Sequence, residues 1–369
     1  MAEASWEEYC ATGRARAIAL GNRGPMKFDA SGRLHRDIID AYNANGFYVF
    51  TGVLDQQEID ELTREFDELL DNAPVARGAT IDKHGRDVEF PGYYSLALDE
   101  VFRNHQVDGE SENEAVVGLV SHPLMMMDSA LRVYAHPQIM KMVASINGDD
   151  FVPFHESIFH KGAGEGPPTP WHQDGRTHWD ETGRALEGSD GSGKTHGFNL
   201  SVSWSECTPE NCLWVVPGSH KKWLLANDGT FPKSNQRLDD AVPMTLNPGD
   251  CGMVSRSSLH GSYPNKSDTR RITMVLGFHK RDSAIGAETT NVHAFRLPGK
   301  QRQVKYDTEW VETRARMIAL AIDARRQYYP DEEPYEYSGT YLGDGNWNAQ
   351  SRAEISQEGD EYWQRDITL

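Results

Sequence analysis

Hydrophobic side chains early in the chain recur at the spacing of an α-helix. One such run places its members three or four positions apart, on a single helical face: Ile59, Leu62, Phe66 and Leu69. Asp55 and Glu58 precede this run in the pattern of a capping box, so they predict where the helix begins. The same spacing predicts helical structure over residues 121–147 and 308–329.

From residue 151 the pattern changes to short apolar or alternating runs, which are typical of β-strands. Turn sequences such as Pro217-Gly218-Ser219 separate these runs. The predicted strands cover residues 151–161, 198–206, 213–216, 240–246, 251–254 and 272–278. Many short strands at this spacing favour a sandwich or jelly roll, so we expect a mainly β protein with flanking helices, of the α+β class.

The chain divides by composition into three predicted parts. Residues 1–40 are polar and are expected to form a surface arm or a short helix. Residues 41–290 contain the jelly-roll domain with a helical N-terminal part. Residues 291–369 form a helical extension with an acidic, aromatic tail, which we expect to wrap the outside of the barrel or to join copies of the chain in a homo-oligomer.

Charge and hydropathy exclude two classes of partner. The net charge of −19 and the pI near 5.1 argue against nucleic-acid binding, which relies on Lys and Arg to neutralise phosphates. No stretch of the chain approaches the roughly 20 apolar residues that a membrane span needs. The N-terminus is acidic where a signal peptide would be basic, so a cytoplasmic location is expected. The four cysteines lack the spacing of a disulfide framework.

Residues 188–195, Gly-Ser-Asp-Gly-Ser-Gly-Lys-Thr, fit the phosphate-binding pattern G-x-x-x-x-G-K-[ST]. That loop binds phosphate only between a buried strand and a helix, because its backbone N–H groups must converge at a helix N-terminus. Here polar residues precede the pattern and an alternating, strand-like run follows it. We therefore interpret the segment as part of a polar, Gly-rich loop over residues 180–197 that is well placed to cover a site.

The strongest chemical signal is a pair of residues, His172 and Asp174, followed much later by His260. In an extended segment, side chains two positions apart point to the same side, so the pair can bind one cation. A lone H-x-D is common and indicates no more than a surface turn. With His260 added, two imidazoles and one carboxylate can occupy one face of a metal and leave three positions free, which is the facial triad of non-haem Fe(II) oxygenases.

Arg270 and Arg271 begin the predicted strand 272–278, eleven residues after His260. Neighbours in a strand face opposite sides, so only one of these arginines can point inward. A buried guanidinium suits the two-point recognition of a carboxylate, for which lysine is a poor substitute. The alternative is a solvated surface pair.

At this point the chain resembles the phytanoyl-CoA dioxygenase family of Fe(II)/2-oxoglutarate oxygenases. The matching segments occur in family order between residues 42 and 280: Asn45–Phe50, His160–Lys161, Trp171–Asp174, Val215–Lys221, Pro248–Asp250 and His260–Ser267, followed by Arg271. The resemblance implies a double-stranded β-helix (jelly roll, cupin-like), iron bound by His172, Asp174 and His260, and 2-oxoglutarate held through its C5 carboxylate by Arg271 and Ser262. Family spacing and strand phase both favour Arg271 over Arg270.

Other residues near these motifs are candidates for the same pocket. Gln173 and Ser157 are predicted to contact the cosubstrate. The predicted substrate pocket consists of His155, Phe159, Trp171, Arg176, Asn199 and Arg256. The chain departs from the family pattern in the loop after Asp174 and in the segment after residue 290, where substrate-covering segments would lie.

The resemblance implies hydroxylation of an unactivated C–H bond of a small-molecule metabolite, with O2 consumed and 2-oxoglutarate converted to succinate and CO2. Desaturation or ring formation by the same chemistry on a natural-product scaffold is the first alternative. A non-catalytic barrel that keeps its metal as a structural or sensing element is the second, and it would release no succinate when substrate is added. We expect a small amino-acid-like or natural-product substrate.

Overall fold

The computed structural model describes residues 5–76, 78–96, 117–164, 168–174, 195–224, 231–290 and 303–364, with residues 166, 184, 186 and 193. Most of the predicted covering loop, the phosphate-binding-like sequence within it, and Arg176 lie outside these residues. Among the described helices, none is long and apolar enough to cross a membrane.

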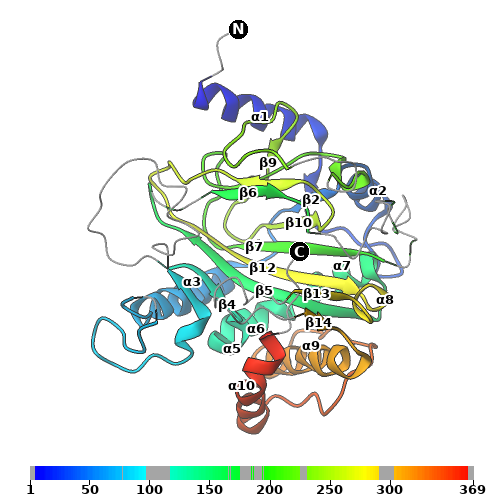
Figure 1. Cartoon of the computed structure of the whole chain (residues 1–369). Coiled ribbons are helices and arrows are strands. Elements are labelled where there is room, and N and C mark those ends of the chain that lie inside the picture. The colour runs from blue at the N-terminus through cyan, green and yellow to red at the C-terminus, as the bar shows by residue number, and fades with distance from the viewer. Residues whose placement is uncertain are drawn as a thin grey trace.

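The larger of two facing sheets has eight strands in the order β1-β2-β10-β7-β12-β5-β4-β3 (Figure 1). Its strands are β1 (Arg23–Gly24), β2 (Phe47–Phe50), β3 (Tyr94–Leu96), β4 (Val117–Ser121), β5 (Phe151–Lys161), β7 (Gly197–Ser203), β10 (Cys251–Ser255) and β12 (Arg271–Lys280). Pairing is antiparallel except between β1 and β2. One face of β12 carries Ile272, Met274, Leu276 and Phe278 into the main hydrophobic core.

The smaller sheet has four strands in the order β6-β11-β8-β9. These are β6 (Thr169–His172), β8 (Leu213–Val215), β9 (Val242–Pro243) and β11 (His260–Ser262). A second hydrophobic cluster joins the two sheets, with Phe47 and Val254 from the larger sheet and Val215 from the smaller one. The expectation of a sheet-rich α+β protein is therefore confirmed.

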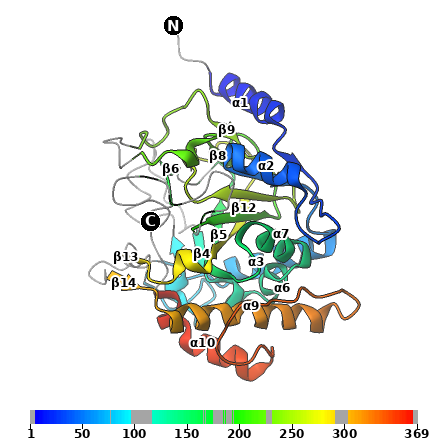
Figure 2. The ribbon, with the colours of Figure 1, turned by 90° about the vertical axis from the view of Figure 1, so that its right-hand side faces the viewer.

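Helices cover the outer faces of both sheets (Figures 1 and 2). Helix α1 (Trp6–Leu20) lies over the smaller sheet, where the Tyr9 ring stacks on Trp214 at 4.7 Å. A Cβ on Gly13 would come within 2.6 Å of the Trp214 ring, so glycine allows this close approach. The predicted N-terminal arm is thus a helix packed on the smaller sheet, followed by α2 (Arg36–Asn45).

Most other helices lie on the side of the larger sheet: α3 (Gln56–Asp71), α5 (Pro123–Met126), α6 (Asp128–Tyr134), α7 (Pro137–Asn147), α8 (Arg281–Ala284) and α9 (Thr308–Tyr328). Helix α10 (Ala349–Gln364) packs on α5 and α9. The predicted capping box at the start of α3 is present, since Asp55 accepts from Glu58 N–H and the Glu58 carboxylate accepts from Asp55 N–H. The predicted helical region 121–147 is three helices, because Met127 has an extended backbone between α5 and α6 and Pro137 begins α7. A short hairpin, β13 (Glu288–Thr290) with β14 (Gln303–Lys305), precedes α9.

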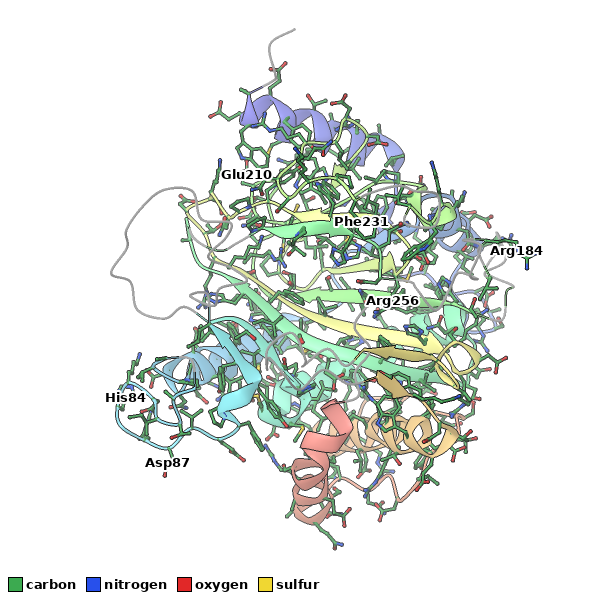
Figure 3. The ribbon with its side chains drawn as sticks, viewed as in Figure 1. His84, Asp87, Arg184, Glu210, Phe231 and Arg256 are labelled. Atoms are coloured by element: carbon green, nitrogen blue, oxygen red, sulfur yellow. The ribbon has the colours of Figure 1, made fainter. Side chains whose placement is uncertain are left out.

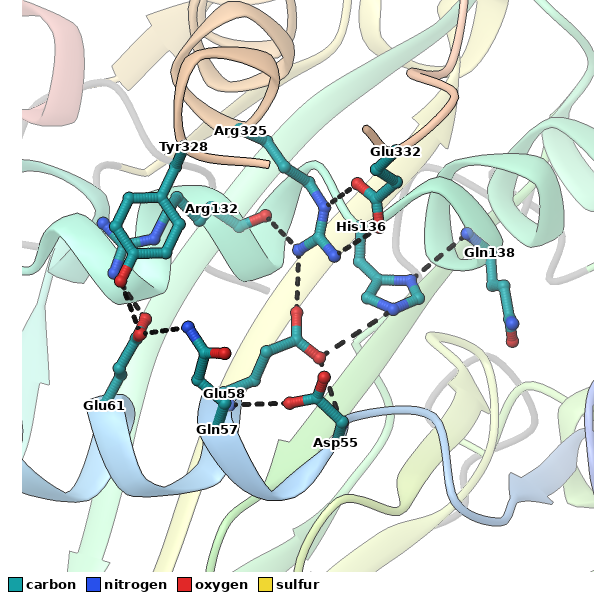
Figure 4. A network of polar contacts seen from close by, with 10 residues as sticks. All are labelled: Asp55, Gln57, Glu58, Glu61, Arg132, His136, Gln138, Arg325, Tyr328 and Glu332. Carbon is teal, nitrogen blue, oxygen red and sulfur yellow. Dashed lines mark hydrogen bonds and ion pairs between the residues drawn. The ribbon is translucent and has the colours of Figure 1, made fainter. Parts of the chain in front are cut away.

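Buried ion pairs attach α9 to the rest of the fold. Arg325 on α9 donates to the Glu58 carboxylate at 2.8 Å and to Glu332 at 2.8 Å, in a network beside His136 (Figure 4). Arg314 lies 3.3 Å from the Glu156 carboxylate of β5, and both side chains are buried. Helix α9 therefore shares the core of the sheet, while the division of the chain near residue 290 stays a prediction.

Candidate metal centre

The two candidate histidines face each other across the smaller sheet. His260 of β11 is the direct antiparallel partner of His172 of β6. Asp174 follows β6, and its carboxylate oxygens lie 3.3 Å from His172 Nε2 and 3.6 Å from His260 Nε2. One donor atom from each of the three residues lies within 4.8 Å of the others, close enough to share one ion.

Backbone carbonyls orient both imidazoles for metal binding. His172 Nδ1 lies 2.7 Å from Pro170 O, and His260 Nδ1 lies 2.9 Å from Ser258 O. A carbonyl only accepts, so each Nδ1 carries a proton, and Nε2 is the atom of each ring that is placed to coordinate a metal. Burial and the neighbouring His172 lower the pKa of His260 to about 4, which keeps this ring neutral.

The carboxylate of Asp174 is ionised and held in place. Burial alone would raise its pKa, but His172 and His260 outweigh burial and hold the pKa well below its usual range. Asn199 Nδ2 donates to Asp174 Oδ2 at 3.0 Å, and Arg256 donates to Asn199 Oδ1 at 3.1 Å. Burial would lower the pKa of His172, but the Asp174 carboxylate outweighs burial and raises it, so a bound cation would displace a proton from this ring. Two imidazoles and one fixed carboxylate fit the donor set of a mononuclear iron site.

A second feature is a pair of buried cations on the larger sheet. Arg271 of β12 is the direct cross-strand partner of Lys161 of β5, and both side chains are about 5% exposed. Like charges opposite each other in a sheet repel, and burial makes both costly. The pKa of Lys161 is lowered well below its usual range, first by burial and then by Arg271.

Neither cation has a carboxylate partner among the described residues. Lys161 Nζ donates to Ser262 Oγ at 2.8 Å and to Tyr263 O at 2.6 Å. Arg271 donates to Asn211 O at 3.1 Å and to Thr273 Oγ1 at 3.2 Å, while its Nε has no partner. The arrangement is a buried, positively charged site joined through Ser262 to the strand that carries His260.

The strand phase separates the two neighbouring arginines as expected. Arg271 points inward, whereas Arg270 is exposed and forms a two-point ion pair with Asp67 of α3, at 2.6 and 3.1 Å.

Three further predicted residues lie near these groups. Ser157 and Phe159 share the inner face of β5 with Lys161 by strand alternation. The Ser157 hydroxyl is buried and without a partner. His155 lies on β5, but its side chain is outside the described part of the structure.

Two predicted residues have a different environment. Gln173 is buried, and its amide is fully engaged with the backbone: it donates to Ser257 O and Lys222 O and accepts from Leu224 N–H. Trp171 belongs to the opposite face of β6 from His172, because alternate residues of a strand face opposite sides, and its indole donates to Gln236 O. Neither residue is free to line the pocket, which corrects our expectation.

Sequence reasoning missed the role of Lys161. It appeared only within the family-like segment His160–Lys161, and nothing local distinguished it from a surface lysine. The available signal was its position at the end of a predicted strand that pairs with the one beginning at Arg271.

The two-sheet fold, the 2-His-1-carboxylate cluster and the adjoining cationic pair together define a non-haem iron oxygenase. The chain belongs to the phytanoyl-CoA dioxygenase (PhyH) family, whose profile matches residues 42–273, more than half of its length. Members of this family use Fe(II), 2-oxoglutarate and O2, and these are the cofactor and cosubstrates of this oxygenase.

Individual relatives are distant. The chain is 22% identical to dioxygenase FUM3 of Gibberella moniliformis over 75% of this chain and 84% of that protein. It is 21% identical to phytanoyl-CoA dioxygenase of Arabidopsis thaliana over 73% of this chain and 96% of that protein. The crystal structure of EctD from S. alaskensis with 2-oxoglutarate and 5-hydroxyectoine matches 70% of this chain and 80% of its own, at 17% identity and a TM-score of 0.48.

Proposed function

We propose that this protein hydroxylates an unactivated C–H bond of a small-molecule metabolite, using Fe(II), 2-oxoglutarate and O2, on a jelly-roll core. The observation that carries this proposal is the presence of two sites that bind opposite charges, one a cation and the other an anion. His172, Asp174 and His260 offer three donors to a cation, and Lys161 with Arg271 offers two positive charges to an anion. 2-Oxoglutarate carries a chelating end and a free carboxylate, so it can satisfy both sites.

Each residue has a defined part in this proposal. His172 and His260 hold iron through Nε2, and Asp174 holds it through a carboxylate oxygen while Asn199 occupies Oδ2. Lys161 and Arg271 bind the C5 carboxylate, which removes their mutual repulsion. Ser262 places Lys161 by accepting from its Nζ and also accepts from Thr169 N–H. When bound, iron supplies the activation of O2 that couples decarboxylation of 2-oxoglutarate to oxidation of the substrate.

The chain also controls where the cosubstrate lies. Arg271 and Thr273 face inward on β12, and Ser157 and Phe159 face inward on β5, so the anion site continues along this inner face. The buried position of the cations excludes water, which strengthens their attraction to a carboxylate.

A succinate-release screen across metabolite classes tests the proposal. We expect a substrate to stimulate succinate formation and to gain one oxygen by mass spectrometry. A substrate that loses two hydrogens instead would identify desaturation or ring formation. A protein that binds Fe(II) but never converts 2-oxoglutarate would be the non-catalytic barrel, and this proposal would fail.

A further inference from the structure

Arg256 is a buried arginine beside the metal centre, and the roles described above do not use its charge. It follows β10, lies over the middle strands of the larger sheet (Figure 3), and is 4% exposed. Its side chain donates one hydrogen bond, to Asn199 Oδ1 at 3.1 Å, and its Nε is buried without a partner. Its guanidinium carbon lies 4.3 Å from the centre of the Phe154 ring.

Comparison with the other buried arginines shows what Arg256 lacks. Arg132, Arg314 and Arg325 each form an ion pair with a glutamate, at distances of 2.7, 3.3 and 2.8 Å. Among the buried arginines that the structure describes, Arg256 and Arg271 have no carboxylate within ion-pairing distance. A buried guanidinium without an anion is costly unless a ligand pairs with it. Arg271 has such a ligand in the proposed function, whereas Arg256 faces the Asp174 carboxylate only through Asn199, and its Nε is left without a partner.

The two arginines without an ion pair lie on different elements, Arg271 on β12 and Arg256 just after β10. Arg271 begins β12, whereas Asn199, which holds Arg256, is paired with Gly277 six residues further along the same strand. The two backbone positions are thus roughly 20 Å apart along the strand. Arg256 approaches the metal centre from its own side: its carbonyl accepts from Asp174 N–H at 2.6 Å, and its guanidinium is linked to the Asp174 carboxylate through Asn199.

The surroundings of Arg256 suit an organic anion. Phe154 packs on His279 with ring centres 4.2 Å apart, and Tyr306 stacks on Trp310 at 3.8 Å in the same hydrophobic cluster. Tyr306 and Trp310 come from the segment around the start of α9. This segment thus places aromatic side chains near the Arg256 guanidinium, which is linked to Asp174 by two hydrogen bonds through Asn199.

We propose that Arg256 binds a carboxylate of the organic substrate and so holds its C–H bond at the iron. This inference rests on the proposed oxygenase function and adds the chemical class of the substrate. A planar guanidinium recognises a carboxylate through paired N–H donors, and the free Nε is one of the donors available for it.

Two variants separate anion binding from positioning of Asp174. Arg256→Gln removes the charge but keeps an amide that can donate to Asn199, and Asn199→Leu removes the contact with Asp174 but keeps the guanidinium. The probes are matched pairs of small carboxylic acids and their primary amides, assayed for stimulation of succinate release. Mn(II) and 2-oxoglutarate affinities are measured by calorimetry without substrate.

We expect acids, and not their amides, to stimulate the wild-type protein. Arg256→Gln should raise the KM of the acid by at least about 30-fold, the loss expected for the partner of a buried charge, and this change should exceed any change in its Mn(II) and 2-oxoglutarate affinities. Asn199→Leu should weaken Mn(II) binding instead.

Two results would overturn this inference: no acid among the stimulating compounds, or an Arg256→Gln variant that weakens Mn(II) as much as Asn199→Leu and leaves the KM unchanged. Failure of the oxygenase function itself is distinguishable, since the wild-type protein would then fail to bind 2-oxoglutarate or to convert it with any compound.

Discussion

Replacement of Arg271 by methionine should separate cosubstrate binding from metal binding. The guanidinium is about 5% exposed and lies opposite Lys161, so it would meet a carboxylate out of contact with water. Loss of one partner from a buried charge pair costs roughly 2–5 kcal/mol. Because Lys161 remains beside the site as a second donor, we expect the lower half of that range, which corresponds to an increase of roughly 30- to 300-fold in the Kd of 2-oxoglutarate.

The ligand-free protein should respond differently from the complex. Arg271→Met breaks hydrogen bonds to Asn211 O and Thr273 Oγ1 but also ends the repulsion of Lys161. We therefore expect the free energy of unfolding without ligand to change by no more than about 1 kcal/mol, since these contributions oppose each other.

Calorimetry with Mn(II) in place of Fe(II) measures both affinities without turnover. Arg270→Met is the matched control, because Arg270 is exposed and its pair with Asp67 should contribute no more than about 1 kcal/mol to stability. The reasoning is refuted if Arg271→Met binds 2-oxoglutarate within threefold of wild type, or if Arg270→Met is the variant that loses it.

Three other changes test the metal centre and the helical layer. Asp174→Ala should weaken Mn(II) binding, measured by calorimetry, by at least about 10–100-fold, since even the hydrogen-bond partners of metal ligands have effects of that size; unchanged metal affinity would rule out Asp174 as a ligand. The wild-type protein should hydroxylate and not chlorinate in high salt. His136 has a pKa lowered to about 4, first by burial, so it stays neutral while the unfolded chain takes up a proton below pH 6.5. The free energy of unfolding, measured with denaturant, should therefore fall between pH 6.5 and 4 by up to about 3 kcal/mol more in wild type than in His136→Asn. The same dependence of this free energy on pH in both proteins would contradict the prediction. Arg325→Met should lower the free energy of unfolding by about 3–5 kcal/mol, because it leaves Glu58 buried without its partner. As a control, replacement of the exposed Arg326 by alanine should lower it by less than about 1 kcal/mol, and equal decreases in the two variants would count against the buried network.

The fold was predictable where hydrophobic spacing was regular. The helix over residues 56–71 was predicted closely because it buries one consistent face, and the strand over 151–161 and the helix over 308–328 were predicted closely because each is a long apolar segment with clear ends. Helix α1 was not, since its sequence shows little amphipathic spacing and its burial depends on Trp214, a residue more than 190 positions away. Strands β6 and β11 are only four and three residues long, too short for a periodic signal.

The site was predictable where its residues are close in sequence or match a family segment. His172, Asp174 and His260 come together, and Arg271 is buried opposite Lys161, while the roles of these residues stay predictions. The errors at Gln173 and Trp171 have one cause: proximity in sequence to a ligand was taken for proximity to the pocket, although neighbours in a strand face opposite ways. The cationic partner Lys161 was missed because its environment is created by the pairing of β5 with β12, which sequence spacing does not reveal.

The central claim is that one iron site and one cationic pair hold the same 2-oxoglutarate molecule. Its most direct test is anaerobic titration of the Fe(II)-loaded protein with 2-oxoglutarate, followed by the visible charge-transfer absorption that a chelated 2-oxo acid gives with Fe(II). We predict a saturable band in wild type at one equivalent of 2-oxoglutarate. Its half-saturation should move to higher concentration in Arg271→Met and in Lys161→Met. A protein that binds Fe(II) through His172, Asp174 and His260 yet develops no such band, or one whose titration is unchanged in both variants, would contradict the account.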